Sequence, residues 1–506
     1  MYTRRSFFRV GAGVAAATTL GGAGMFGYTS SASTTDWSKL RAQLAGTLVL
    51  PPDSGYLEAK RLISAEFDRV NPQAIAYCVS TEDVRRCVLF AREHGVPATP
   101  RSGGHSFNGW STTPGLIIDT SKLNHAAVGS TVKFGPGLKG VDSIPALKAH
   151  GVTLPIGGCP TVSPGGFLLG GGLGWQTRKY GLAADRLVSA RVVLADGRVV
   201  RASASQYGDL YWALRGGGGG NFGIVTEFES RPTVVDKVIS YRVTWPWAKV
   251  TDVIAAWQPW LIAGPDELAT TLVIVLPDAA PGAVPIVQVV GAYLGPKAEA
   301  DAAINGLISA VGSPPATNAA EELPYDTAMM RAFGCGDKTV DQCHVVGQTP
   351  GALLGRTKFV AHRYRTFTGP IPAAGINPIV TAFDANRRAG QNRSLVFAGW
   401  GGQANRVPVT DTAWPHRDAE FAVGFSGEVT KADPTPDDTG SATAWANNGF
   451  AAMDPYSSGH TYLNYGHDGL PNWQWAYYGC NYDRLVTVKR KYDPDNFFSF
   501  SQSIGK

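Results

Sequence analysis

The sequence predicts an α+β protein, and three of its features carry this prediction. Residues 75–99 read as strand, helix and strand, the pattern of a βαβ unit. After about residue 232, long strands with alternating apolar side chains are interspersed with helices, as in an antiparallel sheet backed by helices. The 61 Gly and 33 Pro among 506 residues imply many turns, which argues against coiled coils and long helical arrays.

The N-terminal elements are predicted from apolar spacing and from helix signals. Ser80 precedes an amphipathic pattern and Gly95 follows it, which predicts a helix between them. The Asp196-Gly197 turn joins two apolar runs into a hairpin. The predicted elements in this part are helices at 56–67, 80–95, 144–150 and 209–214, and strands at 75–79, 97–99, 116–119, 188–194 and 199–200.

The middle of the chain has the longer strands, and the last helix follows an aromatic-rich stretch. Strands are predicted at 238–245, 271–276, 286–293 and 394–399, with helices at 250–262, 297–311 and 481–491. No internal repeat is visible. Length alone predicts about three domains, with two large interleaved domains as the alternative.

Charge and composition exclude several classes of protein. The chain has 45 Lys plus Arg against 40 Asp plus Glu, so its net charge of +5 argues against binding nucleic acid through charge. With 44% hydrophobic and 17% charged residues, the chain has material for a sizeable core and is not disordered as a whole.

Residues 1–34 are predicted to be a twin-arginine signal peptide. The pair Arg4-Arg5 is followed by Phe7-Phe8 and by a weakly apolar run rich in Gly and Ala. An ordinary secretory signal or a membrane anchor is the alternative, although the run is too rich in Gly and Thr for a convincing spanning helix. We therefore expect the export machinery as a partner, a secreted or periplasmic location, and no membrane partner for the mature protein.

The six cysteines do not form a disulfide-dense pattern or the C-x-x-C pairs of a zinc site, and no metal site is predicted. Cys335 and Cys343 are eight residues apart in a loop-like stretch. They form a disulfide in an oxidising compartment or stay reduced, and the sequence favours neither.

Three glycine-rich loops are candidates for binding an anion. Residues 102–106, 165–174 and 216–223 offer backbone N–H groups that form concave anion sites without positive side chains. Together they are suited to enclosing a dinucleotide pyrophosphate. None matches a P-loop or opens a typical Rossmann unit, and for each loop taken alone a simple tight turn is an equal alternative.

Several motifs in combination resemble one family. They are Arg101–Trp110, Gly158–Val162 with Gly170–Gly174, Tyr180–Asp185, Asp209–Val225 and Tyr477–Ser503. This set resembles the berberine bridge enzyme-like flavin oxidoreductases, which belong to the vanillyl-alcohol oxidase superfamily. The resemblance covers roughly residues 50–232 and 410–506.

The resemblance implies a PCMH-type FAD-binding domain of two α/β subdomains, joined to a substrate domain with an antiparallel sheet backed by helices. The implied limits are 35–234 for the FAD-binding domain and 235–455 for the substrate domain. Residues 456–506 are expected to return to the FAD-binding domain.

The cofactor implied by the resemblance is FAD with two covalent bonds. His105 stands where the family bonds the flavin 8α-methyl, and Cys159 where it bonds C6. Imidazole and thiolate are nucleophilic enough for this chemistry. The other residues expected around the FAD are Arg101, Ser102, Gly103, Gly104, Ser106, Gly109, Val162, Gly165, Gly170, Gly171, Gly172, Gly174, Trp175, Gly223, Ile224, Val225, Asn464 and Asn481.

The resemblance points to Tyr465 as the base that takes the hydroxyl proton of a substrate. Tyr462 is expected beside it on the same face of a strand. A phenol titrates near pH 10, so a nearby cation or dipole is expected to lower the pKa of Tyr465. Gln403, on a strand predicted to alternate over 396–406, is a further candidate facing the substrate. Packing alone is the alternative for each of these side chains.

The implied activity is oxidation of an alcohol on a small-molecule substrate, a carbohydrate or a glycosylated or polycyclic natural product, to a carbonyl or lactone. Electrons would then pass to O2, giving hydrogen peroxide. Val162 occupies the position at which Val accompanies the family's oxidases and Leu its dehydrogenases. A dehydrogenase with another acceptor and a non-catalytic flavin or sugar binder are the alternatives.

Overall fold

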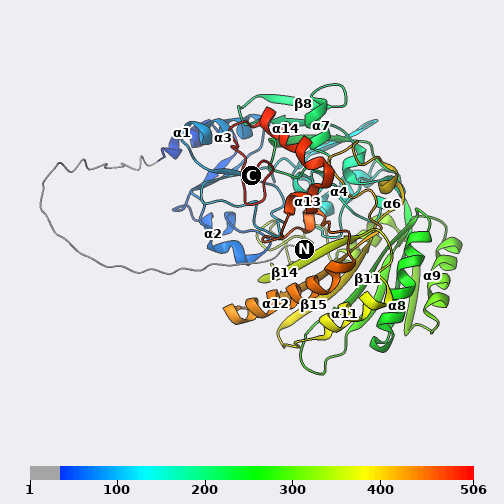
Figure 1. The fold of residues 1–506 in the computed structure, drawn as a ribbon. Helices are drawn as coiled ribbons and strands as arrows, with labels where there is room; N and C mark the ends of the chain where they lie inside the picture. Colours follow the sequence, from blue (N-terminus) through cyan, green and yellow to red (C-terminus); the bar gives the residue numbers. More distant parts are fainter. Residues whose placement is uncertain (1–34) are drawn as a thin grey trace, which may run out of the picture. The chain divides into compact units, whose positions relative to one another are not determined.

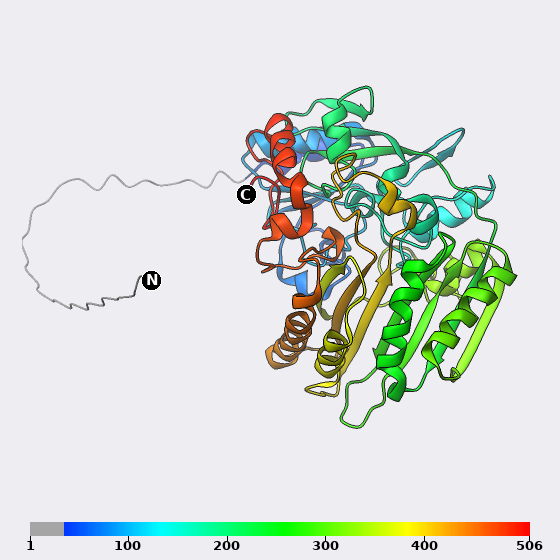
Figure 2. The ribbon, with the colours of Figure 1, turned by 45° about the vertical axis from the view of Figure 1, so that its right-hand side comes forward.

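The computed structural model describes residues 35–506, so the predicted signal peptide at 1–34 lies outside the described residues. The described strands form three sheets, of four, five and seven strands. The two smaller sheets lie together in one half, and the seven-stranded sheet forms the other half (Figures 1 and 2). Within this part of the chain, no helix is both long and apolar enough to cross a bilayer.

The four-stranded sheet is built around the predicted βαβ unit, which is confirmed. Its order is β1-β2-β4-β3, and β4 pairs in parallel with β2 and with β3. The Ser80 hydroxyl accepts the backbone N–H of Asp83 at 3.1 Å, so the helix begins where its cap predicts. The bounds are α1 Trp37–Gln43, β1 Thr47–Val49, α2 Tyr56–Ala59, η1 Ala65–Arg69, β2 Ala74–Tyr77, α3 Thr81–Glu93, β3 Ala98–Arg101 and β4 Leu116–Asp119.

The helix predicted over 56–67 is wrong as a single element. Two short pieces, α2 and η1, replace it, because the Ile63 N–H bonds the carbonyl of Gly104 instead of a carbonyl in its own turn. A tertiary contact has overridden the local helical spacing.

The five-stranded sheet has the order β5-β6-β9-β7-β8 and only antiparallel pairs. The predicted hairpin is confirmed as β7 and β8, which pair from Ser189 with Ser203 to Val193 with Val199. The bounds are β5 Ala126–Val128, β6 Val132–Phe134, α4 Gly140–Lys148, α5 Pro164–Phe167, α6 Thr177–Tyr180, η2 Ala183–Arg186, β7 Leu187–Val193, β8 Val199–Ser203, α7 Gly208–Ala213 and β9 Ile224–Ser230.

The seven-stranded sheet is antiparallel throughout, as predicted, with the order β13-β10-β12-β11-β15-β16-β14. Helices α8, α9, α11 and α12 cover one face (Figures 1 and 2), where Trp257, Phe397 and Trp445 share a core. The bounds are β10 Lys237–Trp245, η3 Trp247–Lys249, α8 Val250–Ala263, β11 Leu268–Leu276, β12 Ile286–Tyr293, α9 Lys297–Val311, β13 Thr317–Pro324, α10 Tyr325–Ala332, β14 Phe359–Phe367, α11 Ala373–Asp384, β15 Gln391–Gly399, η4 Gly402–Arg406, β16 Phe421–Val429 and α12 Pro436–Met453.

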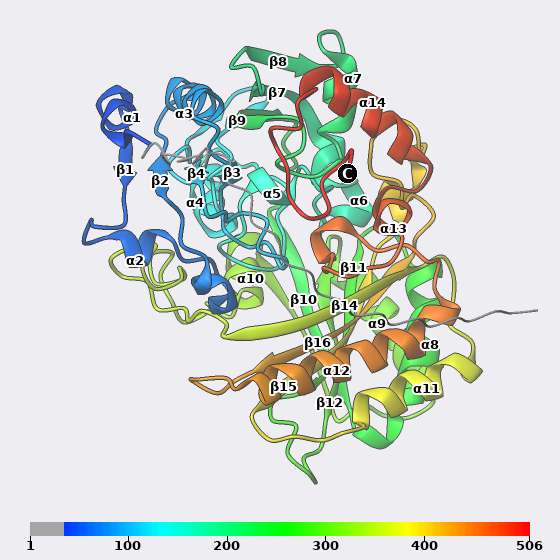
Figure 3. The same cartoon turned by 60° about the vertical axis from the view of Figure 1, so that its left-hand side comes forward.

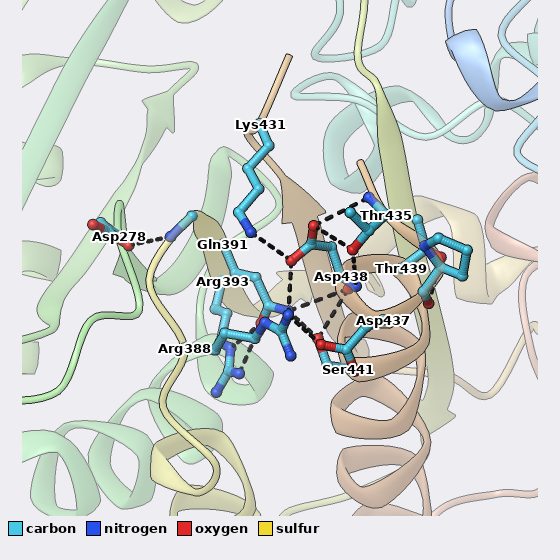
Figure 4. A network of polar contacts seen from close by, with 12 residues as sticks. Asp278, Arg388, Gln391, Arg393, Lys431, Thr435, Asp437, Asp438, Thr439 and Ser441 are labelled. Atoms are coloured by element: carbon cyan, nitrogen blue, oxygen red, sulfur yellow. Dashed lines mark hydrogen bonds and ion pairs between the residues drawn. The ribbon is translucent and has the colours of Figure 1, made fainter. Parts of the chain in front are cut away.

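A polar network fixes the start of α12 against the sheet (Figure 4). The Thr435 hydroxyl accepts the Asp438 N–H at 3.2 Å, and the Asp438 carboxylate accepts the Thr435 N–H at 3.1 Å, which is a reciprocal cap. Lys431 donates to the same carboxylate at 2.7 Å and Arg388 at 2.8 Å. These cations and hydrogen bonds hold the pKa of Asp438 well below its usual range, with the bond from Lys431 the largest cause.

The C-terminal segment returns to the five-stranded sheet and its helices (Figure 1). The buried Lys489 ammonium donates to the carbonyl of Asn221 at 2.7 Å and to Asp493 at 2.6 Å, which ties the last helix to the loop before β9. The bounds are η5 Asp454–Tyr456, η6 Leu463–Tyr465, α13 Trp473–Tyr478, η7 Gly479–Asn481 and α14 Tyr482–Tyr492.

Cys335 and Cys343 form a disulfide, which resolves the alternative that the sequence left open.

Candidate active site

A cavity of about 500 Å³ collects residues from all three sheets and from the returning C-terminal segment. The loop after β3 forms one wall, and glycine-rich segments before α5 and before β9 form a second. The seven-stranded sheet contributes Tyr364, Val396 and Ala398, and the segment around η6 closes the remaining side. Residues far apart in the sequence therefore meet in one space large enough for a sizeable cofactor.

Most of the predicted site residues line this cavity. They are Arg101, Ser102, Gly103, Gly104, His105, Ser106, Cys159, Val162, Gly165, Gly223, Ile224, Val225, Tyr462, Asn464 and Tyr465. The remaining predicted residues do not line it, and they are Gly109, Gly170, Gly171, Gly172, Gly174, Trp175, Asn481 and Gln403.

The glycines of the run at 170–174 lie outside the cavity lining and pack closely against neighbouring segments. A Cβ on Gly170 would collide with the side chain of Asn464, and one on Gly171 would come within 2.8 Å of the Trp414 ring. A Cβ on Gly174 would collide with the carbonyl oxygen of Ile156. Gly170 therefore allows Asn464 of η6 to lie against this run, while Gly171 and Gly174 allow close approach of Trp414 and Ile156.

Gly109, Trp175 and Asn481 also have structural surroundings. A Cβ on Gly109 would come within 2.6 Å of the Phe67 ring, and Trp175 packs in a core cluster outside the cavity. The Asn481 amide donates to the carbonyl of Val409 at 2.9 Å.

Gln403 was expected on a strand facing the substrate, and this expectation is wrong. Strand β15 ends at Gly399, and Gly401 and Gly402, with φ of +85° and +60°, turn the chain into η4. The Gln403 side chain accepts a hydrogen bond from Arg406 at 3.2 Å outside the cavity. Val396 and Ala398 are the side chains of this strand that reach the cavity.

Three buried polar atoms at the cavity lack a hydrogen-bond partner among residues 35–506. Arg101 pairs through Nε with Asp119, both side chains being at most 5% exposed, but its Nη1 has no partner. The hydroxyls of Ser111 and Ser163 are equally unpaired, and all three of these donors belong to residues that line the cavity. Buried polar groups are almost always satisfied, so a polar ligand in the cavity is the natural partner. The phosphate and polyol groups of FAD fit this donor set.

His105 is held in a defined orientation by a residue whose role the sequence did not reveal. Its Nε2 and the Thr161 hydroxyl lie 2.8 Å apart. Burial, helped by the charge of Lys139, lowers the pKa of His105 to about 4. The imidazole is therefore neutral at pH 7, and in the tautomer whose Nε2–H donates to Thr161 the unprotonated Nδ1 can act as a nucleophile.

Cys159 lines the same cavity and is exposed to it. Desolvation of its sulfur by the surrounding protein raises the pKa of the thiol. The thiol is thus protonated at pH 7 in the protein alone.

Tyr465 has a free hydroxyl, without a hydrogen-bond partner in the described chain, and lines the cavity. Its ring centroid lies 4.6 Å from that of Tyr364 and 5.0 Å from that of Tyr462. Burial, followed by the charge of an ionised Cys159, raises the pKa of Tyr465 to about 12. The expectation that a cation or dipole lowers this pKa is therefore wrong for the protein alone.

Tyr462 is engaged in structure and does not present a free base. Its hydroxyl accepts the Gly172 N–H at 2.9 Å and the Asn464 amide at 2.7 Å, and the side chain is 2% exposed. Burial raises the pKa of its phenol. The two tyrosines are not on a strand as predicted. Tyr462 is the N-cap of the 3₁₀ helix η6 and Tyr465 is its last residue, and three residues per turn bring these positions together.

Comparisons with known proteins agree with this architecture. Residues 72–203 match the family described as FAD binding domain, and residues 461–505 match berberine and berberine-like. The chain is 30% identical over 472 residues to the uncharacterized FAD-linked oxidoreductase YgaK of Bacillus subtilis, covering 92% of this chain and 98% of YgaK.

Solved structures share the fold over nearly the whole chain. BBE-like 1 of Physcomitrella patens has a TM-score of 0.82 and 26% identity, over 93% of this chain and 99% of that one. The 6-hydroxy-D-nicotine oxidase of Arthrobacter nicotinovorans has a TM-score of 0.78 and 25% identity, over 91% and 98%.

The fold and the cavity define an FAD-dependent oxidoreductase with a PCMH-type FAD-binding fold, as the sequence predicted. The chain belongs to the berberine bridge enzyme-like family of FAD-linked oxidoreductases.

Proposed function

We propose that the protein is an oxidase that carries doubly attached FAD and oxidises an alcohol to a carbonyl or lactone, with reduction of O2 to hydrogen peroxide. The alcohol belongs to a carbohydrate or to a glycosylated or polycyclic natural product. One observation carries this proposal: the free hydroxyl of Tyr465 lies in the same cavity as His105 and Cys159. Peroxide release and oxygen uptake with a panel of such alcohols test it.

His105 and Cys159 are the residues that would hold the FAD. The contact of Nε2 with Thr161 leaves Nδ1 as the nitrogen available for a bond. Arg101, Ser111 and Ser163 would donate the hydrogen bonds that their buried atoms lack. When bound, FAD supplies a two-electron acceptor, and the protein is left to position the alcohol and to take its proton.

Tyr465 is the residue that would take this proton. Its hydroxyl is free, whereas that of Tyr462 is held by Gly172 and Asn464. A group that receives a proton must lie within hydrogen-bond reach of it, so the alcohol oxygen would sit beside Tyr465. The side chains of Tyr364 and Val396 line the same cavity, and the Tyr364 ring lies 4.6 Å from that of Tyr465.

Removing the Thr161 hydroxyl is expected to impair attachment through His105. Thr161→Val keeps the shape but leaves Nε2 without its partner, so we expect the histidyl bond to form about tenfold more slowly. Peptide mass spectrometry of protein sampled during FAD loading measures the rate at which the histidyl bond forms. Thr487→Val is the matched control, because it makes the same substitution at a threonine on α14 that bonds the Asp483 carbonyl and lies outside the cavity lining. Equal rates in the two variants would contradict the role of Thr161.

The Val162 side chain is expected to be small enough to leave a path by which oxygen reaches the flavin. It lines both the main cavity and a second, largely apolar cavity of about 30 Å³ whose lining includes Leu138 and Leu154. An added methylene in a closely packed place blocks a narrow path. Val162→Leu should slow reoxidation of the reduced enzyme by air about tenfold or more, with reduction by substrate retained. Stopped-flow absorbance measures both steps, and unchanged reoxidation would refute the gate.

Export by the twin-arginine route is a further part of the proposal. It is supported by Arg4-Arg5 with Phe7-Phe8 and by the disulfide between Cys335 and Cys343, a bond that persists in oxidising compartments. Recovery of folded, yellow protein outside the cytoplasm is the corresponding test.

A further inference from the structure

The wall that the seven-stranded sheet presents to the cavity is apolar. Strands β15, β16 and β14 lie side by side (Figure 3), and their register places Val396, Gly424 and Tyr364 in one row. The next row contains Ala398, Ala422 and Thr366, and the Thr366 hydroxyl is bonded to Ser458 and lies outside the cavity lining. Val396, Ala398 and Tyr364 line the cavity, so the floor that the sheet gives to the substrate side of the site consists of two apolar side chains and one aromatic ring.

Gly424 allows the Tyr364 ring to lie across this floor. A Cβ at position 424 would collide with that ring, so any other residue would displace it. In its place on the sheet, the ring of Tyr364 lies 4.6 Å from the ring of Tyr465 at an interplanar angle of 33°. The proposed base is therefore flanked by a broad aromatic surface.

Further rings extend this surface to the edge of the cavity. We call Phe107, His362, Tyr364 and Tyr465 the aromatic arc. Phe107 stacks on His362 with centroids 4.0 Å apart and planes at 12°, and His362 lies 6.5 Å from Tyr364 at 29°. Phe107 is 37% exposed, so this end of the arc reaches solvent. Burial lowers the pKa of His362 to about 3, so the arc carries no charge at pH 7.

Two of the polar side chains near this wall already have protein partners, and the unpaired donors of Arg101, Ser111 and Ser163 are assigned to the FAD. Asn464 donates to the Phe167 carbonyl at 3.1 Å and to Tyr462, and Asn108 accepts the Asp468 N–H at 3.1 Å. Arg101 is the charged member of the lining, and Asp119 pairs with it. A sugar ring has several hydroxyls that need partners, and each one left unpaired on burial lowers affinity. This wall supplies few partners for them.

We propose that the substrate presents a flat, uncharged, apolar ring system to Tyr364 and Val396, with its alcohol at Tyr465, in preference to a free oligosaccharide. This inference rests on the proposed function and narrows its substrate class to aromatic or polycyclic alcohols. Stacking on the arc holds the ring plane, and the small side chains at 398, 422 and 424 leave room for it.

The test compares 2-naphthalenemethanol, a flat bicyclic alcohol, with cellobiose on the FAD-loaded enzyme. We expect kcat/KM from peroxide release to favour the bicyclic alcohol by about tenfold or more. Val396→Gln places an unmatched amide in the floor and should lower that value about tenfold. Val275→Gln is the matched control. Val275 lies on the neighbouring strand β11, where it pairs with Ser394 and faces the same side of the sheet as Val396, but it does not line the cavity.

A second measurement separates this inference from the proposed function. Binding of each probe is followed by its perturbation of the flavin absorbance, without turnover. We call the inferred site for a flat ring beside Tyr364 and Val396 the ring site. If the bicyclic alcohol binds more tightly than cellobiose and Val396→Gln weakens that binding, the ring site is supported. This holds even if no peroxide forms, in which case only the proposed function fails. Preference for cellobiose, insensitivity to Val396→Gln, or binding of neither probe would overturn the ring site, whereas peroxide from cellobiose would leave the oxidase activity standing.

Discussion

Tyr465→Phe is expected to lower kcat by about 10²–10⁴-fold with little change in KM, because the variant loses a proton acceptor and keeps its shape. The anaerobic rate of flavin reduction by substrate measures this step directly. Tyr364→Phe is the matched control, since it removes a hydroxyl from the neighbouring ring and leaves the proposed base intact. An unchanged reduction rate in Tyr465→Phe would assign the proton to another group.

The pH dependence of the same step follows from the pKa of Tyr465. Burial raises this pKa to about 12, so the phenol is protonated at pH 7 and its proton-accepting form becomes more abundant as pH rises. The reduction rate is therefore expected to rise with pH through the neutral and alkaline range, by up to about tenfold per unit. In Tyr465→Phe this rise should disappear.

Removing both attachment residues is expected to release all of the flavin on denaturation. His105→Ala and Cys159→Ala should each keep a yellow acid precipitate through the remaining bond, whereas the double variant should lose its flavin to the supernatant. Absorbance of pellet and supernatant after acid precipitation measures the outcome. Cys480→Ala is a control, because Cys480 is an exposed cysteine outside the cavity lining. Flavin released in full from the unmodified protein would contradict the attachment.

The fold was predictable where local pattern and final packing agree. The capped helix α3 and the long alternating strands β10, β11 and β12 lie close to their predicted places. Strand β13 was missed because it is mostly exposed and shows no alternation, and β14 because polar residues such as His362 and Arg363 interrupt its apolar pattern.

The site was predictable only in part, because motifs identify residues and not their surroundings. His105 and Cys159 stand in recognisable sequence and do line one cavity. The glycines at 170–174 carry a similar signal, yet they serve packing. The alignment of Val396 with Gly424 and Tyr364 depends on the register of three strands, which the sequence of each strand does not contain.

The most direct test of the oxidase assignment needs no knowledge of the substrate. The enzyme is reduced by light without oxygen, mixed with air-saturated buffer or with an anaerobic quinone dye, and followed by flavin absorbance and peroxide release. We expect air to restore the oxidised spectrum rapidly, with one peroxide formed per flavin. Reduced enzyme that persists in air and reacts quickly with the quinone would contradict the oxidase assignment and identify a dehydrogenase.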